Sequence, residues 1–211
     1  MKKKNKILLI ATAIFALVAI IFFYLQMYSG DNVIADEVIA TVNGEEIYQT
    51  DYDRIKELNS SLSDDEAIKL VMKELLVYQE AYRLGFSVNE EDLNARINQL
   101  KTEMPDLYSL CIKQYGSETA YRTALSYTML YNMVYDYHAR QYIKSLNCNI
   151  DIVVEEILGC GYASAEEIDH NKDEVIISFL KEKHKEKIKS NFEDWNEREY
   201  EQADKEYIRF G

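Results

Sequence analysis

Residues 37–48 read Glu-Val-Ile-Ala-Thr-Val-Asn-Gly-Glu-Glu-Ile-Tyr, and this stretch sets the start of the fold. The run from Glu37 to Val42 favours a short strand, because β-branched side chains suit a pleated sheet. Asn43-Gly44 is a strong tight-turn signal, since both residue types tolerate a positive φ. The apolar pattern continues briefly after the turn, and Thr50 then opens a helix. The predicted order is therefore strand, tight turn, helix.

A series of helices follows, and capping signals mark their ends. Ser63-Asp64-Asp65-Glu66 is a full capping box, and Gly85 fits the position just past the end of that helix. The apolar residues between these signals recur at three- and four-residue steps, which predicts one buried face: Ile68, Val71, Leu75, Tyr78 and Tyr82. Three further helices are expected, over about 89–104, 105–115 and 117–146.

The C-terminal part is predicted to contain an irregular segment, a helix and a strand. Residues 147–172 read as an irregular connector, with a helical turn or two over 152–158 that Gly159-Cys160-Gly161 interrupts. A charged helix is expected from 173 to about 201, and residues 205–210 alternate polar and apolar types as a strand does. We expect a mainly α fold in which a small two-stranded sheet, 37–42 with 205–210, joins the chain ends and the last helix packs among the helices of 51–145.

Three stretches together resemble one known family. Val38–Ile47 is similar to the opening of the SurA/PrsA-like N-terminal domain, the peptide-binding domain of extracytoplasmic foldases. Val71–Phe86, with Gln79-Glu80-Ala81 near its end, resembles the long helix of that domain, and Val88–Leu93 resembles the start of its next helix. The resemblance spans about residues 33–145. It implies a helical chaperone lobe, completed by a returning C-terminal helix and strand.

The sequence departs from that family between the two parts of the lobe. Relatives insert a parvulin isomerase domain there, which needs roughly ninety residues and has its own strand and Gly-Gly signatures. Only some thirty residues stand between residue 146 and the last helix, and neither signature occurs. We therefore expect no enzyme activity and do not carry the isomerase activity over.

The first thirty residues predict a membrane anchor. Four lysines precede Ile7–Tyr28, a run without charge that would reach roughly 33 Å as a helix, enough to cross a hydrocarbon core of about 30 Å. Basic flanks stay in the cytoplasm, so the bulk of the chain is expected outside it, tethered to the cell membrane by a single pass. A cleaved signal peptide is the alternative, with Val33-Ile34-Ala35 as its cleavage site. The expected domains are 1–30, the anchor, and 31–211, the lobe, made of 33–146, 147–172 and 173–211.

The charge balance bears on partners. All 37 acidic residues follow position 30, together with 20 of the 24 Lys and Arg. The resulting negative field disfavours binding to nucleic acid and to anionic lipid surfaces. It either attracts basic polypeptides or only keeps the protein soluble by mutual repulsion.

The residues that usually carry chemistry are scattered. Cys148 and Cys160 could close a short loop, whereas Cys111 has no evident partner, and no Cys/His spacing suits a metal. No nucleophile–base or phosphate-binding motif occurs. We expect no catalytic residue, no cofactor and no metal. His138 is expected to be packed or on the surface.

The helix over 117–146 holds the candidate binding residues. The chain has 17 tyrosines, and Tyr127, Tyr131 and Tyr135 stand four residues apart on one helical stripe. With Met129 and Met133 they are either packing residues or a wall for unfolded polypeptides, with Tyr131 expected to be buried. The function favoured by the resemblance is a chaperone for unfolded or exported polypeptides. A dedicated assembly subunit for one membrane or cell-envelope partner is the alternative, and residual prolyl isomerisation is a third. The oligomeric state stays open.

Overall fold

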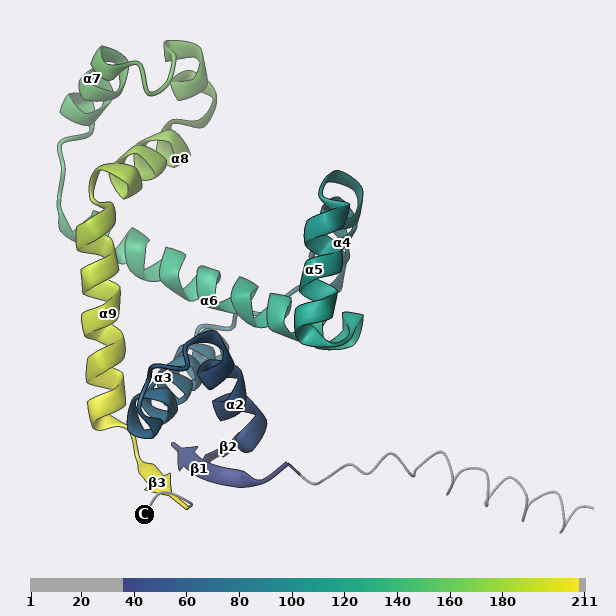
Figure 1. Ribbon diagram of the computed structural model, residues 1–211. Helices are drawn as coiled ribbons and strands as arrows, with labels where there is room; N and C mark the ends of the chain where they lie inside the picture. The colour runs from purple at the N-terminus through teal and green to yellow at the C-terminus, as the bar shows by residue number, and fades with distance from the viewer. Residues whose placement is uncertain (1–35, 209–211) are drawn as a thin grey trace, which may run out of the picture.

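The first strand lies at the centre of a small antiparallel sheet in the computed structural model, which describes residues 36–208 (Figure 1). β1 (Val38–Val42) pairs with β2 (Glu45–Tyr48) on one side and with β3 (Lys205–Tyr207) on the other. Val42 stands opposite both Glu45 and Lys205. Asn43 and Gly44 have φ values of 51° and 80°, the positive values that a two-residue hairpin turn requires.

The predicted pairing of the chain ends is confirmed, but the prediction of two strands is wrong, because the sheet has three. The missed strand is β2. Its two glutamates are exposed at the sheet edge, where charge discourages unwanted pairing, while Ile47 is 1% exposed and packs into the core. Glu45 and Glu46 are two adjacent polar residues, so this segment lacks the apolar alternation from which a strand is predicted.

The Asn-Gly turn also ties together elements that are far apart in sequence. The Asn43 N–H donates to the carbonyl of Asp204 at 2.7 Å, and the Asp204 N–H donates to the Asn43 side chain at 3.1 Å. The Asn43 amide donates to Gln79 at 2.9 Å, and the Gln79 amide donates to the Val42 carbonyl at 3.2 Å. The turn therefore holds both α3 (Asp64–Arg83) and the C-terminal segment.

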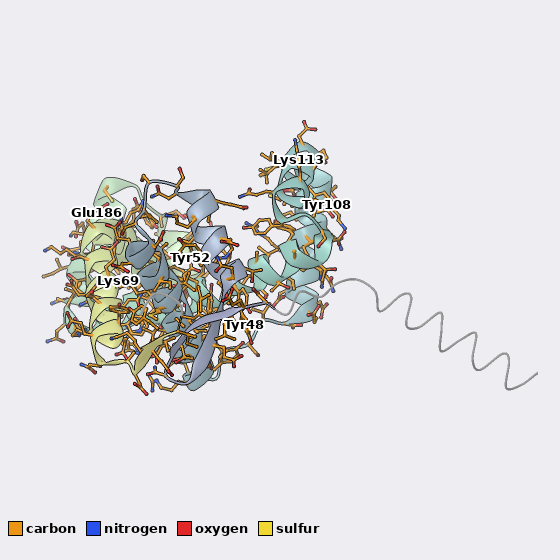
Figure 2. All side chains as sticks on the ribbon, turned by 60° about the horizontal axis from the view of Figure 1, so that its bottom comes forward. Tyr48, Tyr52, Lys69, Tyr108, Lys113 and Glu186 are labelled. Atoms are coloured by element: carbon orange, nitrogen blue, oxygen red, sulfur yellow. The ribbon has the colours of Figure 1, made fainter. Side chains whose placement is uncertain are left out.

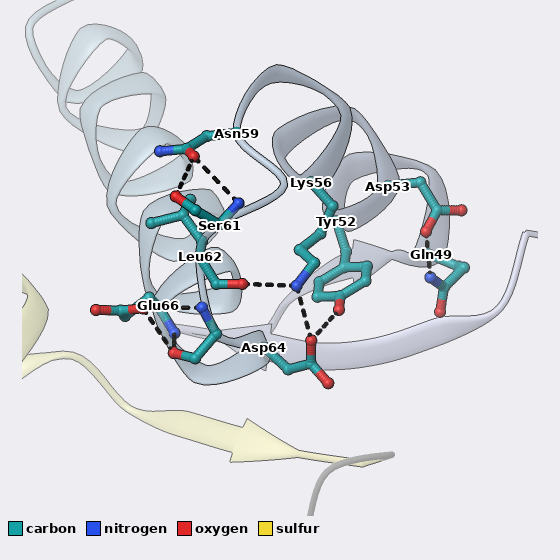
Figure 3. Close-up of polar contacts among 10 residues, drawn as sticks. Gln49, Tyr52, Asp53, Lys56, Asn59, Ser61, Leu62, Asp64 and Glu66 are labelled. Carbon is teal, nitrogen blue, oxygen red and sulfur yellow. Dashed lines mark hydrogen bonds and ion pairs between the residues drawn. The ribbon is translucent and has the colours of Figure 1, made fainter.

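Polar contacts fix α2 (Gln49–Leu58) against the start of α3 (Figure 3). The Ser63 N–H donates to the Glu66 carboxylate at 2.8 Å, which confirms the predicted capping box. The Tyr52 hydroxyl and the Lys56 ammonium both donate to Asp64, at 2.5 and 3.1 Å. Beneath this link the sheet packs against α2 and α3 in one apolar core, which includes Ile39, Val42, Ile47, Ile55, Ile68 and Met72.

The long helix α6 (Glu118–Ser145) runs through the middle of the molecule, and a pair of shorter helices lies at each of its ends (Figure 1). At its N-terminal end, α4 (Glu90–Glu103) and α5 (Pro105–Tyr115) form a hairpin that stands apart from the sheet. The predicted boundaries are confirmed, since Pro105 begins α5 and Gly116 ends it with a φ of 76°. No residue of α5 is buried.

At the other end of α6 the helical turns expected over 152–158 are confirmed, but the prediction that the rest of 147–172 is irregular is wrong. α7 (Ile150–Cys160) and α8 (Ala165–Lys183) are both helices, with a kink at Asn171 in α8. Gly159 lies within the last turn of α7, and Gly161 ends that helix with a φ of 68°. The glycines therefore mark a helix end rather than a break in structure. These two helices form an apolar core with the end of α6, including Ile143, Val153, Ile157, Ile168 and Phe179.

The last helix is α9 (Lys185–Gln202), which runs from α8 back to the sheet (Figure 1). The single helix expected over 173–201 is divided at His184, whose φ of −111° and ψ of 16° end α8. α9 packs on α3 and α6 as expected, through Phe192 and Trp195 against Val77, Leu130 and Val134. Glu197 on α9 also pairs with both Lys69 and Lys73 on α3.

Two expectations concern the N-terminus and the cysteines. The predicted anchor, Ile7–Tyr28, lies outside the described residues. From 36 to 208 no helix combines the length and the apolar character that a membrane span needs. Cys111, Cys148 and Cys160 are free thiols, so Cys148 and Cys160 are not bridged. Within the same residues no three His, Cys, Asp or Glu side chains gather in a way that could hold a metal ion.

Candidate functional site

A groove of about 700 Å³ lies between the sheet side of the lobe and the N-terminal half of α6. One wall comes from β2, α2 and α3, and the other from the end of α5 and the first half of α6. Tyr48 lines the groove, and in Figure 2 this residue lies at the edge of the main body, on the side of the hairpin that carries Tyr108. The fold therefore makes a concave surface from segments that are up to about eighty residues apart in sequence.

Tyrosines form the apolar part of the groove. The rings of Tyr78 on α3 and Tyr127 on α6 stack with centroids 4.7 Å apart and planes at 19°, so they close the groove from both walls. Tyr127 is 41% exposed and Tyr131 37%. Burial raises the pKa of each of these three hydroxyls, and that of Tyr78 is raised most. The tyrosines are therefore neutral and offer flat apolar faces with a hydrogen-bonding tip.

An ionic region adjoins the tyrosines. Arg54 on α2 donates to Glu74 on α3 at 2.5 Å, and both side chains are about one-third exposed. For Arg54, burial is the largest single cause and acts to lower the pKa, but the hydrogen bond that Arg54 donates to Glu74 and the negative charge of Glu74 together outweigh burial, so the pKa is raised. Glu46 accepts from the Tyr48 hydroxyl at 2.5 Å, and Asp51 accepts from the Tyr48 N–H at 3.3 Å.

The five predicted binding residues have three different surroundings. Tyr127 and Tyr131 line the groove. Tyr135 and Met133 instead pack against the core that α9 forms with α3 and α6, and Tyr135 meets Phe192 at 5.2 Å. Met129 lies in a shallow hollow beside α4, away from the groove. The prediction that Tyr131 is buried is wrong: the residue is 37% exposed because it lines the groove, while its ring also contacts that of Phe192 at 5.5 Å between centroids.

Several groove residues were not identified from the sequence as site residues: Tyr48, Asp51, Arg54, Glu74, Tyr78 and Tyr115. Tyr78 had been placed on the buried face of its helix, and it is indeed partly packed. The pairing of Arg54 with Glu74 joins two helices, so no local spacing reveals it. The one available signal was the high tyrosine content of the chain, 17 residues.

His138 is a packing residue between α6 and α9. Its ring lies 4.2 Å from that of Trp195 and 5.6 Å from that of Phe192. Its buried Nε2 has no hydrogen-bond partner within 36–208, and Glu80 Oε1 is 4.0 Å away. Burial lowers the pKa of His138, and Arg83 and Arg198 act in the same direction while Glu80 opposes them.

Comparison with protein-family models identifies the family. The model described as the SurA-like N-terminal domain matches residues 1–125, more than half of the 211 residues. The chain belongs to this SurA-like family. The matched part contains the Asn-Gly turn, β2, α2 and α3, so one whole wall of the groove is built from SurA-like domain elements. Tyr127 and Tyr131, on the opposite wall, follow just beyond the match.

One solved structure similar to this SurA-like chain comes from work on Campylobacter jejuni. That work describes the virulence factor PEB4 and the periplasmic protein Cj1289 as structurally related SurA-like chaperones. The similarity covers 82% of this chain and 100% of that chain, with 12% sequence identity and a TM-score of 0.47. A search of curated proteins found no match. The assignment to the SurA-like family therefore rests on the family match.

Proposed function

We propose that the chain is a chaperone that binds unfolded or exported polypeptides outside the cytoplasm. The observation that carries the proposal is the groove of about 700 Å³ with tyrosines on both walls, of which Tyr127 and Tyr131 are exposed, in a member of the SurA-like family. Apolar grooves with a few polar groups are the usual form of a binding site.

The chemistry of the groove suits varied clients. A tyrosine ring offers a large apolar face at low conformational cost and keeps a hydroxyl for a polar neighbour. Tyr127 and Tyr131 stand one helical turn apart on α6, so their rings can contact successive parts of one client segment. The groove is open and its rings are partly exposed, which favours weak and reversible binding over a fixed complex.

The proposal includes the arrangement of the whole chain. Ile7–Tyr28 would anchor the protein in the cell membrane, with the four lysines on the cytoplasmic side and the lobe of 31–211 outside. The anchored lobe would then meet polypeptides as they leave the membrane. Met129, Met133 and Tyr135 are assigned to packing around the groove rather than to client contact.

The test is suppression of aggregation of an unfolded test protein by the full chain in a mild detergent. The double variant Tyr127→Ala, Tyr131→Ala should lose most of this activity while its melting temperature changes little, since both rings are more than one-third exposed. The control is Tyr162→Ala, an equally exposed tyrosine beyond the far end of α6, which should keep full activity. A double variant as active as the parent would contradict the proposal. Activity towards only one partner protein would favour a dedicated assembly subunit instead.

A further inference from the structure

The groove carries an excess of negative charge at one end. Its ionisable lining residues, besides tyrosines, are Glu46, Asp51, Glu74 and Arg54. The one cation, Arg54, is paired with Glu74. Glu46 and Asp51 form no ion pair within residues 36–208, and their hydrogen-bond donors, the hydroxyl and N–H of Tyr48, are neutral. Within residues 36–208 the groove lining therefore has three carboxylates and one guanidinium, which leaves a formal charge of −2 at this end.

This acidic end lies next to the tyrosines. Glu74 and Tyr78 stand four residues apart on α3, so their Cβ atoms are about 5–6 Å apart on one face of the helix. Asp51 and Arg54 stand three residues apart on α2, which places Asp51 on the same face as the guanidinium that reaches Glu74. The carboxylates and the Tyr78–Tyr127 stack therefore lie about one helical turn apart in the same groove.

That spacing matches neighbouring side chains of an extended peptide. A strand advances about 3.3 Å per residue, so side chains one or two residues apart can reach the tyrosines and the carboxylates together. A large apolar side chain suits the rings, and a lysine or arginine suits the carboxylates. The acidic surface of the lobe would also attract basic segments from a distance.

We propose that the groove selects client segments in which a large apolar side chain stands within two residues of a lysine or arginine. This inference rests on the proposed function and adds a substrate class to it. The apolar residue packs beside the Tyr78–Tyr127 stack, against the exposed ring of Tyr127, and the cation lies near Glu46 and Asp51. Segments that carry an acidic residue at the same place are rejected by the same carboxylates.

The test uses three labelled peptides that differ at one position beside a phenylalanine: Lys, Gln or Glu. Binding to the full chain in a neutral detergent is followed by fluorescence anisotropy at low salt and at high salt. The Lys peptide should bind best and the Glu peptide worst, with about a tenfold difference in Kd, as expected for a few partly exposed ion pairs. High salt should remove most of that difference, because exposed charges are screened.

Two variants on β2 test whether the peptide preference comes from a charge in the groove. Glu46→Lys should weaken the Lys peptide and strengthen the Glu peptide. Glu45→Lys makes the same charge change on the adjacent residue, whose side chain points to the other face of β2 and does not line the groove, so it should keep the parent preference. Melting curves check that both variants fold.

The outcomes separate the inference from the proposed function. Equal binding of the three peptides, or an equal effect of the two variants, would overturn the charge selectivity and leave the chaperone proposal standing. Failure of all three peptides to bind would overturn both.

Discussion

Replacing Phe192 by alanine tests whether the C-terminal helix is an integral part of the lobe. Phe192 is 3% exposed on α9, and its ring meets those of Tyr131, Tyr135 and Trp195 at 5.5, 5.2 and 5.3 Å. It belongs to the same core as residues of α3 and α6. Truncation of a buried phenylalanine usually costs ~3–5 kcal/mol, as lost apolar contact plus the cavity left behind. Closing this cavity requires three helices to move, so we expect about 4 kcal/mol.

The measurement is thermal and urea unfolding of the variant beside the parent, followed by circular dichroism. For a domain of this size each kcal/mol lowers the melting temperature by about 2–4 °C, which gives a decrease of about 8–16 °C. Phe192→Leu is the matched control, because it keeps most of the volume and should cost less than ~1.5 kcal/mol. A Phe192→Ala protein within about 1 kcal/mol of the parent, or one that unfolds in two separate steps, would refute the account of a single lobe closed by α9.

Three further predictions concern the C-terminal segment, His138 and prolyl isomerisation. A fragment of residues 31–172 lacks α9 and β3 and should be insoluble or unfolded, so a soluble fragment with full cooperative unfolding would contradict the discontinuous lobe. Burial lowers the pKa of His138 in the folded state, so protonation of His138 favours the unfolded state. The free energy of unfolding should therefore fall as the pH drops below about 6.5, the usual pKa of histidine. His138→Gln should reduce this dependence of the free energy of unfolding on pH. In a protease-coupled proline-peptide assay the protein should leave isomerisation at its uncatalysed rate, on a scale of tens of seconds, and clear acceleration by pure protein would disprove this.

Much of the fold follows from local signals. The helix ends at Ser63, Gly85, Pro105 and Gly116 were predicted because capping and turn residues act within one turn of the chain. The pairing of the two chain ends could also be predicted, from two strand patterns with helices between them. The helix ends depend on residues close in sequence, and the strand pairing on two strand patterns at the chain ends, so both can be predicted from the sequence.

The errors have a common cause in tertiary contact. The strand β2 consists of four residues, two of them exposed glutamates, and pairing with β1 rather than local pattern makes it a strand. α7 and α8 are stabilised by the core that they share with the end of α6, and Gly159 and Gly161 only mark the end of α7. The helical stripe of Tyr127, Tyr131 and Tyr135 was correct as geometry. Its division between groove and core depends on where α9 places Phe192, which no spacing on α6 encodes.

Crosslinking from the groove tests the central claim most directly. A photo-crosslinking amino acid replaces Tyr127 in the full chain, and a second protein carries it at Tyr162, beyond the far end of α6. After irradiation in cells, the products are identified by mass spectrometry. We predict that position 127 captures many unrelated exported polypeptides and that position 162 captures few. A single stoichiometric partner at position 127, or equal products from both positions, would contradict the assignment of the groove as a chaperone site.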